Sequence, residues 1–293
     1  MDVRSIEIKQ DMPGFDSFFV SWVCQDGFNI VVDAGPANTA DRLVESLTAH
    51  GLERVDYVFL THIHIDHCGG LGGLLAHYPM AKVVCHDKAI THMVDPSKLW
   101  NSSLKVLGEV AEAYGPPRPV SEERLIPHSV CDLKDLTIIE TPGHAVHHLS
   151  FVYGHRLFAG EAGGNYFIVG DTEYLRPATP PRFFFEVSLG SIDRLLSLED
   201  QPIFFAHFDQ AEGSHRVLQK SREQLVLWKK IIYEQVRKGD QELLERCMEA
   251  LIGQDPNLKG IGKMDDDTVK REKFFMANTI RGFIGYFKEK DNE

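Results

Sequence analysis

The chain has 293 residues, of which 43% are hydrophobic and 25% are charged, close to the composition of an ordinary soluble globular protein. Its 31 basic and 43 acidic residues give a net charge of −12, which argues against a protein that binds nucleic acid by neutralising phosphates. No stretch approaches the ~20 apolar residues that cross a bilayer, and the charged N-terminus lacks the apolar segment of a signal peptide. We therefore expect no nucleic-acid partner and no membrane partner.

The cysteines indicate the compartment. There are five of them, an odd number with no CxxC pair, and they are scattered along the chain. This pattern is typical of reduced thiols in a cytosolic protein, so we expect a cytoplasmic location. The 14 histidines are the unusual part of the composition, and they are unevenly spread.

In chain order, the first half of the sequence predicts strands and short helices. Two apolar runs at 18–24 and 28–32 flank Gln25-Asp26-Gly27, which is typical of a hairpin with a glycine-containing turn. The same kinds of pattern predict strands at 55–60, 82–85, 136–140, 149–152, 157–159 and 203–206, and helices at 39–50, 69–77 and 90–110, the last interrupted at Pro96. These elements indicate a mixed α/β body.

Two later segments differ from this body. Residues 165–186 are rich in aromatics and prolines, too irregular for a core element and too apolar for a plain linker, so we expect a pocket wall, a lid or a packed loop. From residue 211, apolar residues recur at helical spacing. The sequence therefore predicts a catalytic domain at 1–210 and a C-terminal helical region at 211–293, with a homodimer through the helices as one option.

A cluster of potential metal ligands lies directly after the predicted strand 55–60. There the chain reads Thr61-His62-Ile63-His64-Ile65-Asp66-His67, with four potential ligands within six residues. His62 and His64 alternate, so both project to one side of an extended segment. Imidazole nitrogens with a carboxylate suit Zn²⁺, Fe²⁺ or Mn²⁺. A metal site is the natural interpretation.

Other strand ends supply matching groups. Thr141-Pro142-Gly143-His144 follows one predicted strand, and His207 ends another. Glu161 follows Phe158-Ala159-Gly160 and adds a carboxylate. Ligands in α/β folds come from loops beyond strand ends, so we expect these side chains at the same site.

Together, the HxHxDH motif, TPGH, the strand–Gly–acid segment and the late histidine resemble the metallo-β-lactamase-fold hydrolases, above all the glyoxalase II-like and lactonase-like branches. The resemblance covers about residues 1–210. It implies an α/β (α+β) fold, a four-layered αβ/βα sandwich, here with a C-terminal helical extension. It also implies a dinuclear site of divalent ions, with zinc as the first expectation and iron or manganese as alternatives.

Residue by residue, the resemblance assigns the ligands. His62, His64 and His144 would hold the first metal, Asp66, His67 and His207 the second, and Glu161 would bridge both. The bridging residue of the family is usually Asp. Glu reaches further by about 1.5 Å, one C–C bond, so Glu161 could bridge with a shifted rotamer or bind one metal only. Asp171 is a weaker candidate for the same role.

Four further side chains are expected near the site. His148 is expected to support a ligand through a hydrogen bond or by packing, and Asp33 belongs to the family's early DxG element, which is mainly structural. Tyr166 could donate to an oxyanion or form an aromatic wall. Cys68 could touch the metal or act as a small buried apolar side chain.

The implied activity is hydrolysis of an ester, thioester or lactone. Two cations sharing a water lower its pKa toward neutrality, and the resulting hydroxide attacks the carbonyl of a small-molecule substrate. Asp66, the predicted catalytic residue, could protonate the leaving group. The alternatives on the same fold are a phosphodiesterase, which the charge of −12 disfavours, and an iron-dependent enzyme, either a dioxygenase or a diiron oxygen or NO reductase. Glu161 keeps the iron-dependent alternative open, because additional carboxylate character suits iron, although the sequence shows no flavodoxin-like domain for the reductase.

Overall fold

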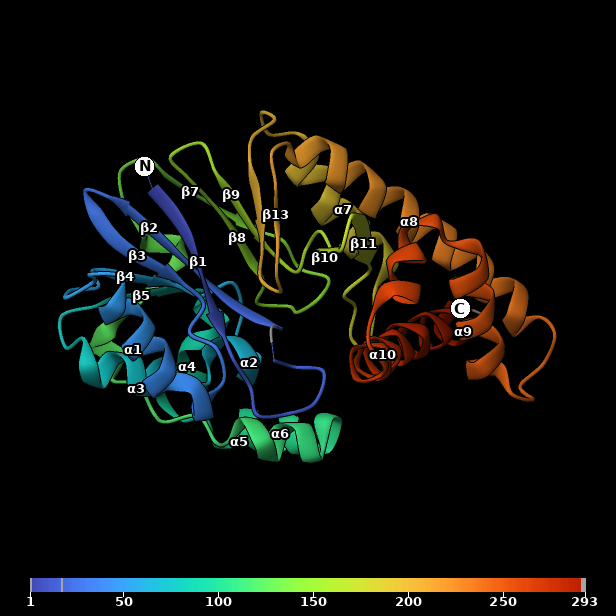
Figure 1. The fold of residues 1–293 in the computed structure, drawn as a ribbon, viewed down its shortest axis with the longest axis horizontal. Helices are drawn as coiled ribbons and strands as arrows, with labels where there is room; N and C mark the ends of the chain where they lie inside the picture. Colours follow the sequence, from blue (N-terminus) through green and yellow to red (C-terminus); the bar gives the residue numbers. More distant parts are fainter. Residues whose placement is uncertain (1, 17, 291–293) are drawn as a thin grey trace. The chain divides into compact units, whose positions relative to one another are not determined.

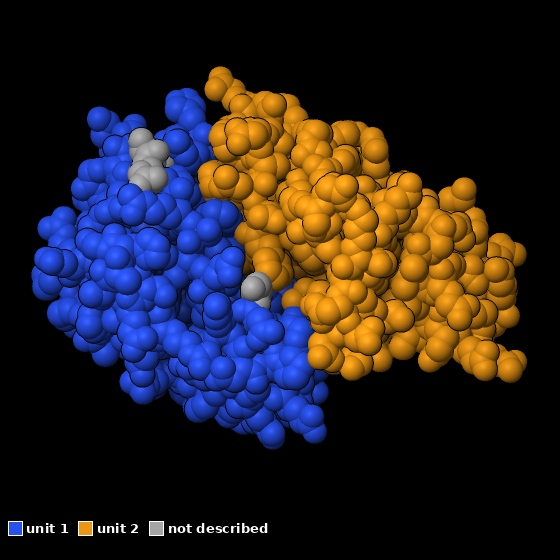
Figure 2. Space-filling model, viewed as in Figure 1, with its two compact units in different colours: residues 1–140, 147–158 blue, residues 141–146, 159–293 orange. Residues whose placement is uncertain are grey.

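The computed structural model describes residues 2–16 and 18–290, and it divides into two compact units. Unit 1 contains residues 1–140 and 147–158, and unit 2 contains residues 141–146 and 159–293 (Figure 2). These compact units differ from the two domains predicted from the sequence, residues 1–210 and 211–293. The predicted domain boundary at residue 210 stays a prediction.

Unit 1 is built on a six-stranded sheet in the order β1-β2-β3-β4-β5-β6 (Figure 1). Its strands are β1 (Asp2–Ile8), β2 (Phe19–Asp26), β3 (Phe28–Val32), β4 (Tyr57–Phe59), β5 (Lys82–Cys85) and β6 (Leu125–Pro127). The first three pair antiparallel, and β3 to β6 pair parallel. The carboxyl ends of β4, β5 and β6 therefore lie along one edge, where parallel sheets place their functional groups.

Helices and three further strands complete unit 1. The helices are α1 (Ala40–Ala49), α2 (Ile65–Cys68), α3 (Leu71–His77), α4 (Ile90–Val94), α5 (Ser97–Leu107) and α6 (Glu109–Tyr114). Helix α1 buries Leu43 and Leu47, as its predicted apolar face requires. Strands β7 (Leu136–Glu140), β8 (Leu149–Tyr153) and the first half of β9 (Leu157–Gly160) pair antiparallel. The predicted mixed α/β body is confirmed.

Unit 2 begins with the loop 141–146 and resumes at the end of β9. Its remaining elements are β10 (Asn165–Val169), β11 (Thr172–Arg176), α7 (Phe185–Leu196), β12 (Ile203–Phe205), β13 (Gln210–Ala211), α8 (Ser214–Val236), α9 (Leu243–Gln254) and α10 (Asp266–Lys290). Helix α8 packs against α7, α9 and α10. This helical layer supports the loops that carry the chemistry of the unit.

The segment 165–186 is more regular than the sequence suggested. Strands β10 and β11 form an antiparallel hairpin around Gly170-Asp171, and Gly170 has a positive φ of 63°. A two-residue turn that starts with glycine is a recognised hairpin signal, and the aromatic content obscured it. Tyr166, Phe167 and Tyr174 are buried, so the expectation of an irregular segment was wrong for residues 165–176, whereas residues 177–184 form no helix or strand.

The C-terminal region is helical, as the periodicity predicts. Its large apolar side chains face inward: Trp228, Phe283 and Phe287 are all buried within unit 2. The indole N–H of Trp228 also donates to Asp255 Oδ2 at 2.6 Å. These residues pack the unit itself, and a homodimer through the helices stays a prediction.

Candidate metal centre

Four predicted ligands of unit 1 follow strand β4. The chain stays extended as far as His64 and then enters helix α2. The Nε2 atom of His62 lies 3.1 Å from Nδ1 of His64, so these two nitrogens face a common point. The turn of α2 brings Oδ2 of Asp66 to 3.5 Å from Nε2 of His67. The motif therefore presents two separate pairs of donor atoms.

A buried carboxylate behind the motif orients both pairs. Asp33 accepts the backbone N–H and the hydroxyl of Thr61, each at 2.8 Å. Its Oδ2 lies 3.0 Å from Nδ1 of His67, and the Thr61 hydroxyl oxygen lies 3.1 Å from Nδ1 of His62. Each Nδ1 faces an acceptor, which places the ring proton there and leaves the Nε2 lone pair for a cation.

The negative charge around His67 also favours a bound cation. Burial lowers the pKa of His67, but the carboxylates of Asp66 and Asp33 raise it well above its usual value. The ring is thus enclosed by negative charge, and a divalent cation at Nε2 compensates the same two carboxylates.

Gly69 and Gly70, directly after α2, allow the chain to approach the loop that carries Asp33. The Gly70 amide donates to Gly35 O at 2.8 Å, and the Ala34 amide donates to His67 O at 2.8 Å. A Cβ on Gly70 would lie 2.4 Å from Ala34 O, closer than real Cβ contacts. Glycine after the motif is therefore a requirement of packing around the ligands, beyond flexibility.

Unit 2 brings its three predicted ligands together. His144 lies in the loop 141–146, and its Nδ1 is 2.9 Å from the carbonyl oxygen of Ala178, which again leaves Nε2 for a cation. Glu161 follows β9 and His207 follows β12. Oε2 of Glu161 lies 2.9 Å from Nε2 of His144, and Oε1 lies 3.6 Å from Nε2 of His207. The carboxylate of Glu161 thus offers one oxygen toward each ring.

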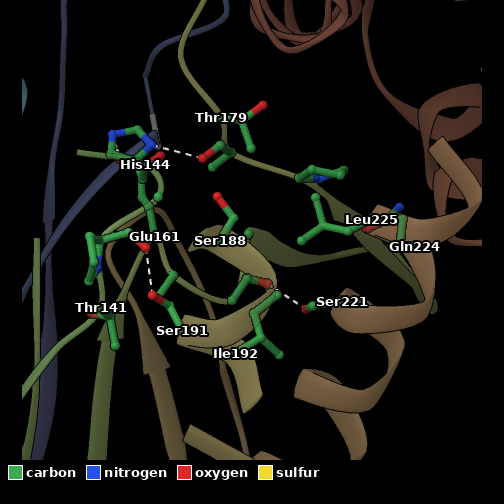
Figure 3. A pocket seen from close by; sticks show the side chains of 17 residues that line it. Thr141, His144, Glu161, Thr179, Ser188, Ser191, Ile192, Ser221, Gln224 and Leu225 are labelled. Carbon is green, nitrogen blue, oxygen red and sulfur yellow. Dashed lines mark hydrogen bonds and ion pairs between the residues drawn. The ribbon is translucent and has the colours of Figure 1, made fainter. Parts of the chain in front are cut away.

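A pocket opens beside His144 and Glu161 within unit 2 (Figure 3). About 360 Å³ of space lies within and in front of it, a volume that includes open solvent. Three buried atoms of its lining residues, Thr179 Oγ1, Ser188 Oγ and Gln224 Oε1, have no hydrogen-bond partner in the described part of the chain. Buried polar groups rarely lack a hydrogen-bond partner. These three atoms are therefore available to bind a polar ligand or water in the pocket. Sequence reasoning missed these residues, because they are spread over three elements with no motif.

The remaining predicted residues fall into different surroundings. His148 is fully buried, and its ring centroid lies 5.2 Å from that of His62, in keeping with a supporting role. The Tyr166 hydroxyl donates to Glu173 at 2.9 Å while its ring packs on Phe205, which favours the aromatic wall over an oxyanion donor. Cys68 is buried and its thiol donates to Ile63 O; burial raises its thiol pKa, so the apolar role is favoured.

Asp171 does not compete with Glu161. It lies at the turn of the β10–β11 hairpin, where its side chain is 88% exposed and pairs with Lys263. An exposed carboxylate with its own ammonium partner is poorly placed to replace a 6% exposed one. Within unit 2, Glu161 is the carboxylate that faces the two histidines.

The mixed α/β fold and its groups of histidines and carboxylates at strand ends are typical of a metal-dependent protein, and comparison with known proteins identifies the family. A family profile described as the Metallo-beta-lactamase superfamily matches residues 14–207. The chain belongs to the metallo-β-lactamase superfamily, and the predicted resemblance and fold class are confirmed.

Individual relatives agree. The metallo-beta-lactamase fold-containing protein ST1585 of Sulfurisphaera tokodaii is 33% identical over 195 residues, which are 63% of this chain and 70% of the relative. A hydroxyacylglutathione hydrolase of Cupriavidus taiwanensis is 30% identical over 207 residues, which are 68% of this chain and 65% of that protein, just under two thirds of its length.

Solved structures show the same fold. The archaeal protein ST1585 superposes with a TM-score of 0.71 at 24% identity, covering 97% of this chain and 98% of that one. The family protein TTHA1429 of Thermus thermophilus superposes with a TM-score of 0.65 at 19% identity, covering 99% of this chain and 94% of that one. The similarity to these two structures therefore extends through the C-terminal helices.

No helix in residues 2–16 and 18–290 is both long and apolar enough to span a membrane.

Proposed function

We propose that this protein is a metal-dependent hydrolase that cleaves an ester, thioester or lactone with the help of two divalent ions. The observation that carries the proposal is the tautomer pattern. His62, His67 and His144 each turn Nδ1 to an acceptor of the fold, so three rings keep Nε2 lone pairs available. Imidazoles serving only as packing have no need of this common orientation.

The predicted ligands suffice for two ions. We assign His62, His64 and His144 to one ion, and Asp66, His67 and His207 to the other. The position of Glu161 supports a bridging role, because each of its oxygens faces one of two histidines assigned to different ions. Nitrogen and carboxylate donors without thiolates suit zinc first, with iron and manganese as alternatives.

When bound, the two ions lower the pKa of a shared water and stabilise the oxyanion of the attacked carbonyl. The chain supplies the rest. Asp66, 16% exposed, would take up the proton lost by the attacking water and pass it to the departing alkoxide or thiolate. Asp33 and Thr61 keep the rings of His62 and His67 in the ligating tautomer.

The pocket beside His144 supports a substrate with a polar acyl or ring group. Thr179 and Ser188 offer hydroxyls, and Gln224 offers an amide oxygen whose own nitrogen is already engaged with Leu175 O and Asp255. Arg and Lys are absent from the described lining of this pocket. An uncharged group that both donates and accepts hydrogen bonds therefore suits it better than an anion does.

A substrate panel tests the proposal. We expect the purified protein to hydrolyse p-nitrophenyl esters, an S-acyl thioester or a lactone, to lose this activity with a chelator and to regain it with Zn²⁺. His144→Ala should abolish the activity, whereas His77→Ala, at an exposed position on α3, should leave it unchanged.

Two results would replace this proposal. Hydrolysis of bis-p-nitrophenyl phosphate with no turnover of any carboxylic ester would favour the phosphodiesterase. A coloured protein with an iron EPR signal and no hydrolytic activity would favour the oxidative alternatives.

A further inference from the structure

A second group of ligand-type side chains lies in unit 1, apart from the predicted centre. His86 follows strand β5, His128 follows strand β6, and Glu140 ends strand β7. Each offers one ligand atom, and these atoms all lie within 4.8 Å of one another. Lone histidines with no motif around them gave no sign of this group in the sequence.

The sheet explains why the two histidines meet. Strands β5 and β6 are parallel neighbours, and Cys85 pairs with Pro127 at their last positions. The next residue of each strand is a histidine, so both rings leave the sheet at the same edge. Their centroids are 4.5 Å apart. His86 and His128, which follow two paired strands, thus supply two of the possible ligands.

The ring of His86 is the independent sign that something is missing. This residue is 4% exposed, and its Nε2 has no hydrogen-bond partner among the residues that the structure describes. The Oε2 atom of Glu140 lies 3.9 Å away, beyond hydrogen-bond distance. A buried ring nitrogen left short of its partner is uncommon in folded proteins, and a cation between Nε2 and the carboxylate would satisfy both.

His128 is prepared as a ligand by its surroundings. Its Nδ1 lies 2.8 Å from Oδ1 of Asp87 and also receives the backbone N–H of Asp87 at 3.2 Å, and its Nε2 lies 3.1 Å from Oε1 of Glu140. A carboxylate on the far nitrogen of a ligating histidine is the usual arrangement around zinc. Asp87 is itself held by Ser129, whose hydroxyl donates to Oδ2 at 2.6 Å.

From this geometry we infer that His86, His128 and Glu140 bind a single Zn²⁺ ion outside the predicted dinuclear centre. Ligand atoms of a tetrahedral zinc site lie roughly 3.4 Å apart, and Glu140 lies at a similar distance from both rings, with Oε1 at 3.1 Å from His128 and Oε2 at 3.9 Å from His86. The side chain of Glu140 is 58% exposed, which leaves room for entry of the ion and for a water as fourth ligand. The ion links the ends of β5 and β6 to the end of β7.

Binding requires one local adjustment at His86. Its Nδ1 accepts the backbone N–H of Lys88 at 3.0 Å, so the ring proton is on Nε2 in the absence of an ion. Zn²⁺ takes the Nε2 lone pair, the proton shifts to Nδ1, and the amide of Lys88 turns away. The adjustment is confined to the three-residue turn Asp87–Ala89, whose first two residues are exposed, and its cost makes this site weaker than the predicted centre.

Zinc stoichiometry tests the inference without any activity assay. The wild type, His128→Ala and Glu140→Gln are dialysed against the same micromolar Zn²⁺ buffer, and bound zinc is measured by ICP-MS. We expect both variants to hold one equivalent less than the wild type and to lose part of the rise in melting temperature that Zn²⁺ produces. His77→Ala and Glu122→Gln, exposed and outside the group, are the matched controls and should equal the wild type.

An anomalous-scattering map from a zinc-soaked crystal of the wild type locates the ion directly. A peak between His86, His128 and Glu140 supports the site. Equal zinc content in the wild type and both variants, with no peak at this position, overturns it. Both substitutions lie at the partly exposed side of the group, so folding of the variants can be verified by their melting temperatures in the absence of zinc.

Discussion

The two ligand sets of the predicted centre are built in different ways. In unit 1, His62, His64, Asp66 and His67 lie within six residues, and one buried carboxylate, Asp33, holds His67 directly and His62 through Thr61. In unit 2, His144, Glu161 and His207 come from three loops up to 63 residues apart in sequence, and His144 faces a carbonyl oxygen of its own, that of Ala178. One set is a local motif, and the other is assembled by the fold.

This contrast determines which substitution should most disturb each set of ligands. The rings of the first set depend on one hydrogen-bonded carboxylate, so a single change behind them should disturb two ligands at once. The second set depends on the reach of Glu161, whose two oxygens serve two histidines. Its weakest point is therefore the bridging side chain itself.

The largest effect should come from Glu161→Ala. Removing the carboxylate that faces both His144 and His207 should remove at least one of the two ions of the predicted centre per chain. The loss of one ion forfeits several kcal/mol of charge stabilisation, so kcat should fall by about 10³-fold. Metal content by ICP-MS and hydrolysis of a p-nitrophenyl ester measure the two effects.

Two variants control this experiment. Glu161→Gln keeps the side-chain volume but not the charge and should also lose metal, which separates ligation from packing. Glu212→Gln, at an exposed position of unit 2, should change neither quantity. Unchanged metal stoichiometry and affinity in Glu161→Ala would contradict the assignment of Glu161 as a ligand.

The same contrast explains which ligands could be predicted from the sequence and which could not. The HxHxDH motif identifies the first set and the family, because its ligands are neighbours in the chain. Glu161 and His207 could be proposed only from their positions at strand ends and from the family pattern. The group of His86, His128 and Glu140 was missed, because it depends on the pairing of β5 with β6, which local pattern does not reveal.

The second effect in size should come from Asp33→Asn. Asp33 accepts two hydrogen bonds from Thr61 and faces Nδ1 of His67, whereas an asparagine amide turns a donor toward one of these donors. Loss of such a supporting carboxylate typically lowers metal affinity by about 10–100-fold. Competition with a fluorescent zinc chelator measures it.

Asp41→Asn, an exposed change in the first turn of α1, is the matched control. If Asp33→Asn binds zinc as tightly as this control does, the shared support in unit 1 is not what sets ligand geometry, and the contrast between the two sets loses its basis.

The smallest effect should come from Gly70→Ala, which acts on the packing beneath the first set. The added Cβ would lie 2.4 Å from Ala34 O, so the backbone of α2 or of the Asp33 loop has to shift, at a cost of about 1–3 kcal/mol in the free energy of unfolding. Urea denaturation measures this cost. Gly253→Ala is the matched control, because a Cβ there meets nothing within 4 Å and alanine favours the helix by about 0.5–1 kcal/mol. Opposite signs for the two substitutions support a close approach at Gly70 as the reason for glycine after the motif. If both stabilise the protein, the motif needs glycine for another reason, and the rigid support of the first set has to be sought elsewhere than in this contact.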